Sequence, residues 1–342
     1  MVALSVLDLS PIPEGADATQ AYRNTVDLAR HVEHWGYRRY WLAEHHNMAG
    51  IGSAATAVLI GHVAGATKTI RVGAGGIMLP NHAPLVIAEQ FGTLESLYPG
   101  RIDLGLGRAP GTDQVTAHAL RRTLTGDVND FPRDVVELQS YFQPSQTGRR
   151  VRAVPGDGLN VPIWILGSSL FGAQLAAALG LPYAFASHFA PAALMQAIEV
   201  YYEQFRPSEQ CDKPYAMAGF NVFAADSEEE AAYVRSSAQQ SVLNLHRGVP
   251  GPLPRPARDF ESGLGPQERA ILQRWFTCSA SGTPETVARL LKSFAEHTGV
   301  DEIMVNANIH DHAARLRSYE IAATVGANLA QEERAPREAD AR

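Results

Sequence analysis

The sequence predicts an α/β protein that folds as a (β/α)8 TIM barrel with a Pro/Gly-rich insertion between strands 7 and 8. Eight short apolar runs alternate along the chain with longer segments of helical periodicity. The length of 342 residues suits a single barrel. The main alternative is a doubly wound open sheet, but LDLSPIPEG after the first strand lacks the GxGxxG pattern of such folds.

Each predicted strand is a short apolar run, often rich in β-branched or aromatic residues. ALSVLDL opens the series, RYWLA follows, and RVGAGGIML carries glycines that mark a bulge or a close approach by a ligand. The eight predicted strands are 3–9, 39–43, 71–79, 101–107, 161–167, 183–187, 218–224 and 301–307.

The predicted helices begin and end at recognisable residues. Gly36 ends the first helix, and Ser53 is a candidate N-cap for the second. Acidic residues follow Ser227, where they suit the helix dipole, and Pro284 occupies a first helical position. The predicted helices are 19–35, 53–67, 84–98, 131–142, 171–179, 190–205, 227–240, 283–297 and a last helix ending near residue 329.

One segment interrupts the alternation. Residues 244–267, NLHRGVPGPLPRPARDFESGLGPQ, are dense in Pro and Gly, and a loop of this length in a compact domain is usually functional. We therefore expect a lid between strands 7 and 8. We also expect residues 1–330 to form a single barrel domain and the charged tail 331–342 to be disordered, because it lacks apolar anchors.

Bulk composition excludes several classes of function. The net charge of -7 argues against an electrostatic nucleic-acid binder. The apolar stretch 53–66 is broken by His62 and is too short to span a membrane. Cys211 and Cys278 are the only cysteines, and the N-terminus lacks the basic region of a signal peptide. We expect a cytoplasmic protein without nucleic-acid or membrane partners.

Barrel enzymes gather their active sites at the carboxyl ends of the strands. Polar residues and glycines concentrate at these ends, which together indicate a site. They are Asp8 and Ser10, Glu44 to His46, Gly75 and Gly76, Gly107 and Arg108, Gly167 to Ser169, Ser187 and His188, and Asn306 and Asn308.

The two adjacent histidines bear on whether the site holds a metal. His45 and His46 point to opposite faces of an extended chain, so only one can face the barrel axis. The HExxH pattern is also absent. We therefore expect no metal, although a metallohydrolase remains an alternative and the second histidine could be purely structural.

Other candidates each have a structural alternative. The guanidinium of Arg108 could grip a phosphate or pair with Asp103 or Asp113. Ser168 and Ser169 precede a helix and could bind an anion or merely cap it. His188 could contact a ligand, act as a base, or be a buried structural histidine. Neither a P-loop nor a GxSxG elbow is present.

The motifs together carry a family resemblance. The run from YWLAEHHNMAG through VGAGGIMLP to PGRIDLGLGRAPG resembles the bacterial luciferase-like flavin-dependent monooxygenases. VPIWILGSS and GLPYAFASHFAP are similar to the alkanal monooxygenase-like branch of that superfamily. The resemblance covers residues 3 to about 327.

The resemblance implies FMN at the carboxyl mouth of the barrel. It implies a catalytic His45 with Glu44 as its acidic neighbour, and a cis peptide between Gly75 and Gly76 against which the flavin packs. Gly107 stands where the luciferase has a reactive cysteine, a departure from the family pattern that leaves light emission open. The remaining cofactor contacts that we expect are Ser10, Arg108, Gly167, Ser168, Ser169, Gly172 and His188, with Arg108 and the two serines at the phosphate.

The implied activity is that of a monooxygenase using reduced FMN (FMNH2) and O2. We expect a small, largely apolar substrate such as an aldehyde or ketone, and a separate NAD(P)H:flavin reductase, because this chain carries no NAD(P)H fingerprint. The resemblance also implies a homodimer. Alternatives are a dehydrogenase of the same fold that uses the deazaflavin F420, and a flavin-binding protein without turnover.

Overall fold

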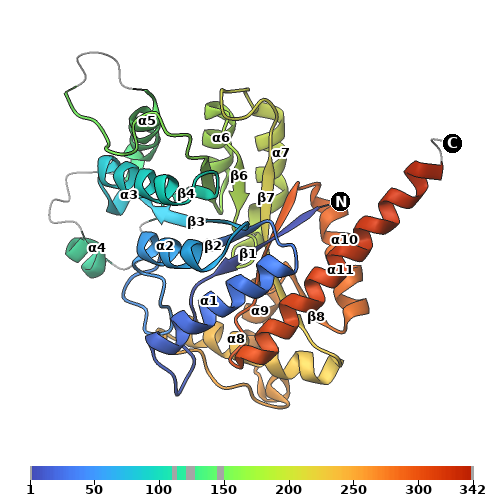
Figure 1. Cartoon of the computed structure of the whole chain (residues 1–342). Helices are drawn as coiled ribbons and strands as arrows, with labels where there is room; N and C mark the ends of the chain where they lie inside the picture. The colour runs from blue at the N-terminus through green and yellow to red at the C-terminus, as the bar shows by residue number, and fades with distance from the viewer. Residues whose placement is uncertain (1, 110–113, 121–127, 145–149, 340–342) are drawn as a thin grey trace.

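The structure, a computed structural model, is a closed barrel of eight parallel strands ringed by helices (Figure 1). It describes residues 2–109, 114–120, 128–144 and 150–339. The ring order is β1-β2-β3-β4-β5-β6-β7-β9, and β9 pairs with β1, which confirms the predicted barrel. The strands are β1 (Ala3–Asp8), β2 (Arg39–Leu42), β3 (Arg71–Met78), β4 (Ile102–Gly107), β5 (Ile163–Gly167), β6 (Tyr183–Phe185), β7 (Ala216–Ala224), β8 (Ser279–Gly282) and β9 (Glu302–Asn306).

A ninth strand lies outside the ring. β8 pairs with residues 221–224 at the carboxyl end of β7, and its register shows no other strand partner in the part of the chain that the structure describes. Its sequence, SASG, has no apolar alternation, which is why the sequence did not predict it. The predicted eighth barrel strand is thus β9, and the Pro/Gly-rich insertion precedes it, as expected.

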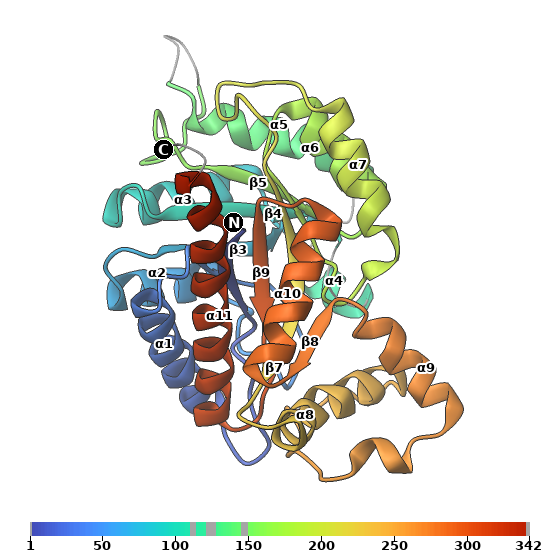
Figure 2. The ribbon, with the colours of Figure 1, turned by 90° about the vertical axis from the view of Figure 1, so that its right-hand side faces the viewer.

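Helices follow the strands and cover the outside of the barrel (Figures 1 and 2). Every predicted helix has a counterpart. The α-helices are α1 (Ala18–His34), α2 (Thr56–Ala66), α3 (Pro84–Leu97), α4 (Gln114–Leu120), α5 (Phe131–Phe142), α6 (Leu170–Leu179), α7 (Leu194–Gln204), α8 (Glu228–His246), α9 (Pro266–Trp275), α10 (Pro284–Thr298) and α11 (His312–Ala339). Short 3-10 turns are η1 (Leu79–Asn81), η2 (Val128–Asp130), η3 (Pro191–Ala193) and η4 (Phe260–Gly263).

Several predicted boundaries were wrong. Ser53 does not cap α2, which begins three residues later after Ala55. α8 continues to His246 and α9 begins at Pro266, so the irregular part of the insertion is shorter than predicted. α11 runs to Ala339, past the predicted end of the last helix near residue 329. Residues 340–342 lie outside the described residues.

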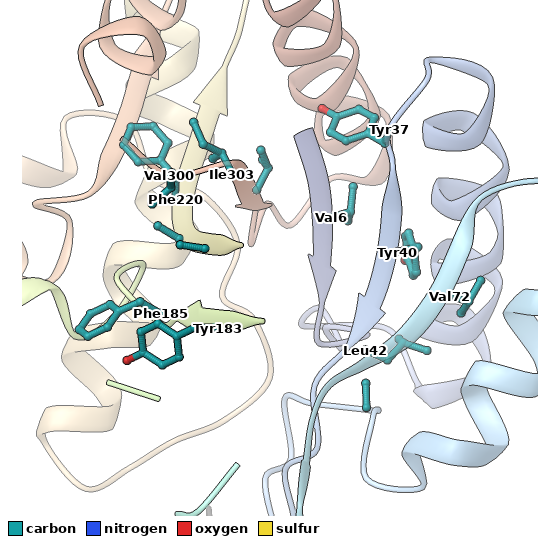
Figure 3. Packing of buried hydrophobic residues seen from close by; sticks show 14 of the residues in the cluster. Val6, Tyr37, Tyr40, Leu42, Val72, Tyr183, Phe185, Phe220, Val300 and Ile303 are labelled. Carbon is teal, nitrogen blue, oxygen red and sulfur yellow. The ribbon is translucent and has the colours of Figure 1, made fainter. Parts of the chain in front are cut away.

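Side chains alternate between the two faces of each barrel strand. On β2, Tyr40 and Leu42 belong to the large core between strands and helices, and Figure 3 shows both beside Val6 of β1 and Val72 of β3. Trp41 points the other way and packs in a second cluster inside the barrel. The side chains at the odd-numbered positions of β2 therefore face the barrel axis, and His45 continues this series beyond the end of the strand.

A buried charge network closes the amino end of the barrel. Asp103 accepts hydrogen bonds from Arg39 Nη1 at 2.7 Å and from Arg71 Nη2 at 2.6 Å. Arg39 also donates to Glu302 at 3.1 Å, and its guanidinium lies 4.8 Å from the ring centre of Trp164. Both carboxylates are fully buried, so each needs these partners. The network seals this end and leaves the carboxyl end as the open one.

The Pro/Gly-rich insertion is attached to the loop after β1. Leu253 donates its N–H to Ile12 O at 2.8 Å, and Glu14 donates to Leu253 O at 2.9 Å. Figure 2 shows α8, α9 and their connection gathered beyond the ends of β7 and β8. The segment is therefore held over the carboxyl mouth, as a lid requires. No helix among the described residues is both long enough and apolar enough to cross a membrane.

Candidate active site

A cavity of about 580 Å³ lies at the carboxyl ends of the barrel strands. Its floor is the apolar interior of the barrel, with Leu7, Trp41, Met217 and Met304. The insertion supplies part of its cover through residues 250–253. Among the residues that the structure describes, its lining contains no Asp, Glu, Lys or Arg. Polar lining comes from His45, His188, Asn221, Ser241, Asn244, Asn306 and Asn308.

His45 is the histidine that faces the cavity. It follows the odd-numbered, inward-facing positions of β2, so the prediction that only one of the two histidines faces the axis is confirmed. Its Nδ1 is buried and has no hydrogen-bond partner among the described residues. Burial lowers the pKa of His45, which the nearby Glu44 carboxylate only partly offsets. His45 is thus a neutral imidazole at pH 7, with hydrogen-bonding capacity left for a ligand.

Glu44 lies behind His45 and organises the loops instead of lining the cavity. Its Oε1 accepts hydrogen bonds from His46 Nε2 at 2.6 Å and His82 Nε2 at 2.8 Å. Its Oε2 accepts the Met78 N–H at 3.0 Å. Burial would raise the pKa of Glu44, but these donors hold it below its ordinary value. Glu44 therefore ties the end of β2 to the end of β3 as an anion.

The same three side chains could be considered as metal ligands, since their ligand atoms lie within 4.8 Å of one another. Both imidazoles, however, approach a single oxygen of Glu44 at hydrogen-bond distances. Each contact is satisfied by an N–H proton on the imidazole. We therefore interpret His46 and His82 as donors to Glu44.

Gly75 and Gly76 provide a bare backbone surface at the wall of the cavity. Gly75 lines the cavity, and the peptide bond that joins it to Gly76 is cis, as the resemblance implied. A Cβ on Gly75 would lie 2.8 Å from Leu7 Cδ1, and one on Gly76 would lie 2.7 Å from the Gly105 carbonyl oxygen. A side chain is therefore excluded at Gly76 and would displace Leu7 at Gly75, and a flat ring could approach this bare backbone.

Arg108 lies beside the start of α6. Its guanidinium carbon is 4.1 Å from the ring centre of Phe171, in the first turn of that helix. Asp103 is occupied by other arginines, which removes one structural alternative for Arg108, while Asp113 lies outside the described residues. Ser169 is the N-cap but makes no side-chain capping bond, so the first N–H groups of α6 keep their capacity for an anion. Ser168 is exposed next to it.

Three more glycines that the sequence predicted as cofactor contacts lie near Arg108 and the start of α6. A Cβ on Gly172 would come 3.3 Å from the Gly167 Cα, so glycine at both positions lets α6 pack closely against the end of β5. Gly107 is the last residue of β4, and a Cβ there would meet only Ile77 O at 3.8 Å. None of these glycines lines the cavity itself, although Leu166 and Ala109 beside them do.

His188 follows β6 in the chain and packs against β7 at the carboxyl side of the barrel. The Asn221 side-chain amide donates to the His188 carbonyl oxygen at 2.6 Å, and Ser187 Oγ donates to Gly219 O at 2.6 Å. The ring packs directly on Gly219, where a Cβ would lie 2.2 Å from His188 Nδ1. Burial, together with the nearby His45, lowers the pKa of His188 to about 4.

The sequence predicted Ser10 as a cofactor contact, but the position of Ser10 in the structure does not support that role. It is fully buried, and its hydroxyl lies 2.8 Å from Thr25 Oγ1. Its N–H donates to Asp8, which in turn accepts from Arg315. This network braces β1 against the helices and lies outside the cavity lining.

Sequence reasoning missed several residues that shape the cavity. Gly219 and Asn221 lie on the inner face of β7 together with Met217, at every second position of the strand. A glycine within a strand signals that a ligand or another part of the chain approaches closely. Trp275 comes from α9, which was not predicted. His82 had no motif that linked it to Glu44, because the contact joins residues 38 positions apart.

Comparison with known proteins supplies the family context. A family model described as luciferase-like monooxygenase matches residues 2–302. A luciferase-like monooxygenase of Escherichia coli (strain K12) is 54% identical over 328 residues, which are 96% of this chain and 98% of the relative. The crystal structure of apo-MsnO8 superimposes with a TM-score of 0.89 at 33% identity, covering 95% of this chain and 98% of that chain.

More distant structures share the fold alone. The oxygenating constituent of 3,6-diketocamphane monooxygenase from Pseudomonas putida, in complex with FMN, matches with a TM-score of 0.69 at 18% identity, covering 94% of this chain and 96% of that chain. An F420-dependent secondary alcohol dehydrogenase matches with a TM-score of 0.65 at 16% identity, covering 93% of this chain and 97% of that chain.

Proposed function

The chain belongs to the luciferase-like monooxygenase family, and from this premise we propose that it is a monooxygenase that uses FMNH2 and O2 to oxidise a small, largely apolar carbonyl compound. The observation that carries the proposal is the cavity, in which the bare backbone of Gly75 and the unpartnered imidazole of His45 line an otherwise largely apolar wall. Such a site suits a flat, uncharged ring system and an oxygen reaction that must be kept from water.

The residues present fit both parts of FMN, the flavin ring and the phosphate. The flavin ring would pack on Gly75 and Gly76, where no side chain intervenes. The phosphate would bind at Arg108 and the start of α6, where Ser169 leaves the first-turn N–H groups available. The apolar floor would take the substrate. When bound, the reduced flavin supplies the electrons that activate dioxygen.

The chain's own groups have defined tasks in this scheme. His45 is a neutral imidazole, so it can accept a proton at the cavity wall and, once protonated, return it. Glu44 fixes the loop that carries His45. The insertion, anchored through Leu253 to the loop after β1, keeps water from the mouth.

We extend the proposal to partners and location. A separate NAD(P)H:flavin reductase supplies the reduced cofactor, and the protein acts in the cytoplasm as a homodimer. The neighbouring helices α2 and α3 expose the apolar side chains Val58, Val86 and Leu97, which a second copy would cover. The mass in solution, measured by light scattering, tests the dimer.

The alternative with specific support is an F420-dependent dehydrogenase of the same fold, because a distant structural neighbour is described as one. Parallel titrations with FMN and F420 separate the two. The monooxygenase proposal predicts that FMN binds and F420 does not.

The decisive activity experiment supplies FMN, a flavin reductase, NADH and ¹⁸O₂ with a panel of medium-chain aldehydes and ketones. Mass spectrometry then follows the label. We expect one ¹⁸O atom in the product. FMN binding, with reduced flavin reoxidised by O2 and hydrogen peroxide released at a rate that no substrate changes, would instead indicate a flavin-binding protein without turnover.

A further inference from the structure

His188 is a second histidine in the cavity, and its ring orientation is fixed by the protein. Nδ1, Cγ and Cε1 face Gly219, since a Cβ there would lie 2.2, 3.0 and 3.2 Å from them. The opposite edge of the ring, which carries Nε2, is therefore turned away from β7. Because His188 lines the cavity, Nε2 is the ring nitrogen that a ligand can reach.

The tautomer follows from the surroundings of the two nitrogens. Nδ1 is buried and has no hydrogen-bond partner among the described residues. A buried N–H without an acceptor is rarer and costlier than a buried lone pair without a donor. The proton therefore resides on Nε2. Burial lowers the pKa of His188 to about 4, so the ring is neutral at pH 7 and presents an N–H donor to the cavity.

Two further contacts hold this donor in place. Asn221 Nδ2 donates to the backbone carbonyl of His188, and the Phe189 ring packs edge-on against the imidazole with centroids 5.0 Å apart. The surrounding wall combines apolar with uncharged polar side chains, and no Asp, Glu, Lys or Arg of the described ranges lines it. An ionised ligand group would therefore be desolvated without a charged partner, whereas a carbonyl oxygen would find a positioned donor.

Deepening the proposed function and resting on it, we propose that His188 is a specificity-determining residue that binds the carbonyl oxygen of an uncharged substrate through Nε2–H, while Gly219 and Asn221 position its ring. The substrate class is thus a neutral ketone or aldehyde, with carboxylates excluded. His188 then contacts the substrate and not the cofactor, which differs from the cofactor contact expected from the sequence.

The test is a binding experiment that needs no turnover. Trp41 and Trp275 line the cavity, so tryptophan fluorescence reports its occupancy. The full chain, with and without FMN, is titrated at pH 7 with cyclohexanone, cyclohexane and cyclohexanecarboxylate. We expect cyclohexanone to bind at least tenfold more tightly than the carboxylate.

Variants separate the hydrogen bond from packing. His188→Leu should weaken cyclohexanone binding about five- to tenfold and leave cyclohexane binding unchanged, because one hydrogen bond is lost. His188→Gln should recover part of the loss. Gly219→Ala should show the same selective loss with the imidazole retained, since the new Cβ displaces the ring. His34→Leu, the same change on the exposed side of α1, is the control and should alter nothing.

Two results would overturn the inference. An equal loss of cyclohexanone and cyclohexane affinity in His188→Leu would show that the ring only fills space. Weaker FMN binding with unchanged cyclohexanone binding would assign His188 to the cofactor. If FMN does not bind to the wild-type chain at all, the proposed function fails, while the ketone titrations still decide the role of His188.

Discussion

The carboxylate of Glu44 accepts a hydrogen bond from Nε2 of His82 across 2.8 Å, which joins the end of β2 to the turn that follows β3. The same carboxylate accepts the Met78 N–H and a bond from His46. One buried anion therefore holds both walls of the cavity that carry His45 and Gly75.

Replacing Glu44 with Gln should lower the free energy of unfolding by about 2–3 kcal/mol. The new amide group would face N–H donors that the carboxylate now satisfies, and the loop that carries His45 would shift. Denaturant unfolding measures the loss, and Glu199→Gln on the exposed face of α7 is the matched control. Equal stability of the two variants would contradict the role assigned to Glu44.

The two glycines of the cavity wall should respond differently to alanine. In Gly76→Ala the Cβ would meet the backbone oxygen of Gly105, which cannot move aside, so we expect a loss of about 2–3 kcal/mol in stability. In Gly75→Ala it would meet the end of the Leu7 side chain, which can adjust. Gly75→Ala should therefore cost less stability but weaken FMN binding. The reverse order in denaturation would refute this reasoning.

We expect the buried charge network at the amino end of the barrel to contribute to the stability of the fold and not to ligand binding. Asp103→Asn leaves Arg39 with a single carboxylate partner, Glu302, and should cost about 3–5 kcal/mol in unfolding free energy. Asp226→Asn removes an exposed partner of Arg317 and should cost less than about 1 kcal/mol. A similar cost for both variants would argue against the buried network.

Stability should fall in mild acid because of His188. Its pKa is about 4 in the folded protein and near the ordinary 6.5 in the unfolded chain, so the unfolded state binds more protons between these pH values. The free energy of unfolding therefore decreases as pH falls from 7 to 4, by at most about 3 kcal/mol from this residue. His188→Leu should flatten that slope, and identical slopes for variant and wild type would be inconsistent with a buried neutral imidazole.

The sequence predicted the barrel because each of its eight strands is an apolar run followed by helix signals, whereas SASG of β8 is not an apolar run. It predicted that only one of His45 and His46 faces the axis, because that depends on strand alternation alone. It could not predict the hydrogen bond between the hydroxyls of Ser10 and Thr25, or the one from His82 to Glu44, because those contacts depend on how distant segments meet in space.

The central claim is that the mouth of the barrel binds FMN with its phosphate at Arg108. Titration of the wild-type chain and Arg108→Leu with FMN and with riboflavin, which lacks the phosphate, tests it most directly, with exposed Arg206→Leu as the control. The account predicts that wild type prefers FMN and that Arg108→Leu loses at least tenfold in FMN affinity while riboflavin affinity is unchanged. Equal affinities of the wild-type chain for FMN and riboflavin would contradict it.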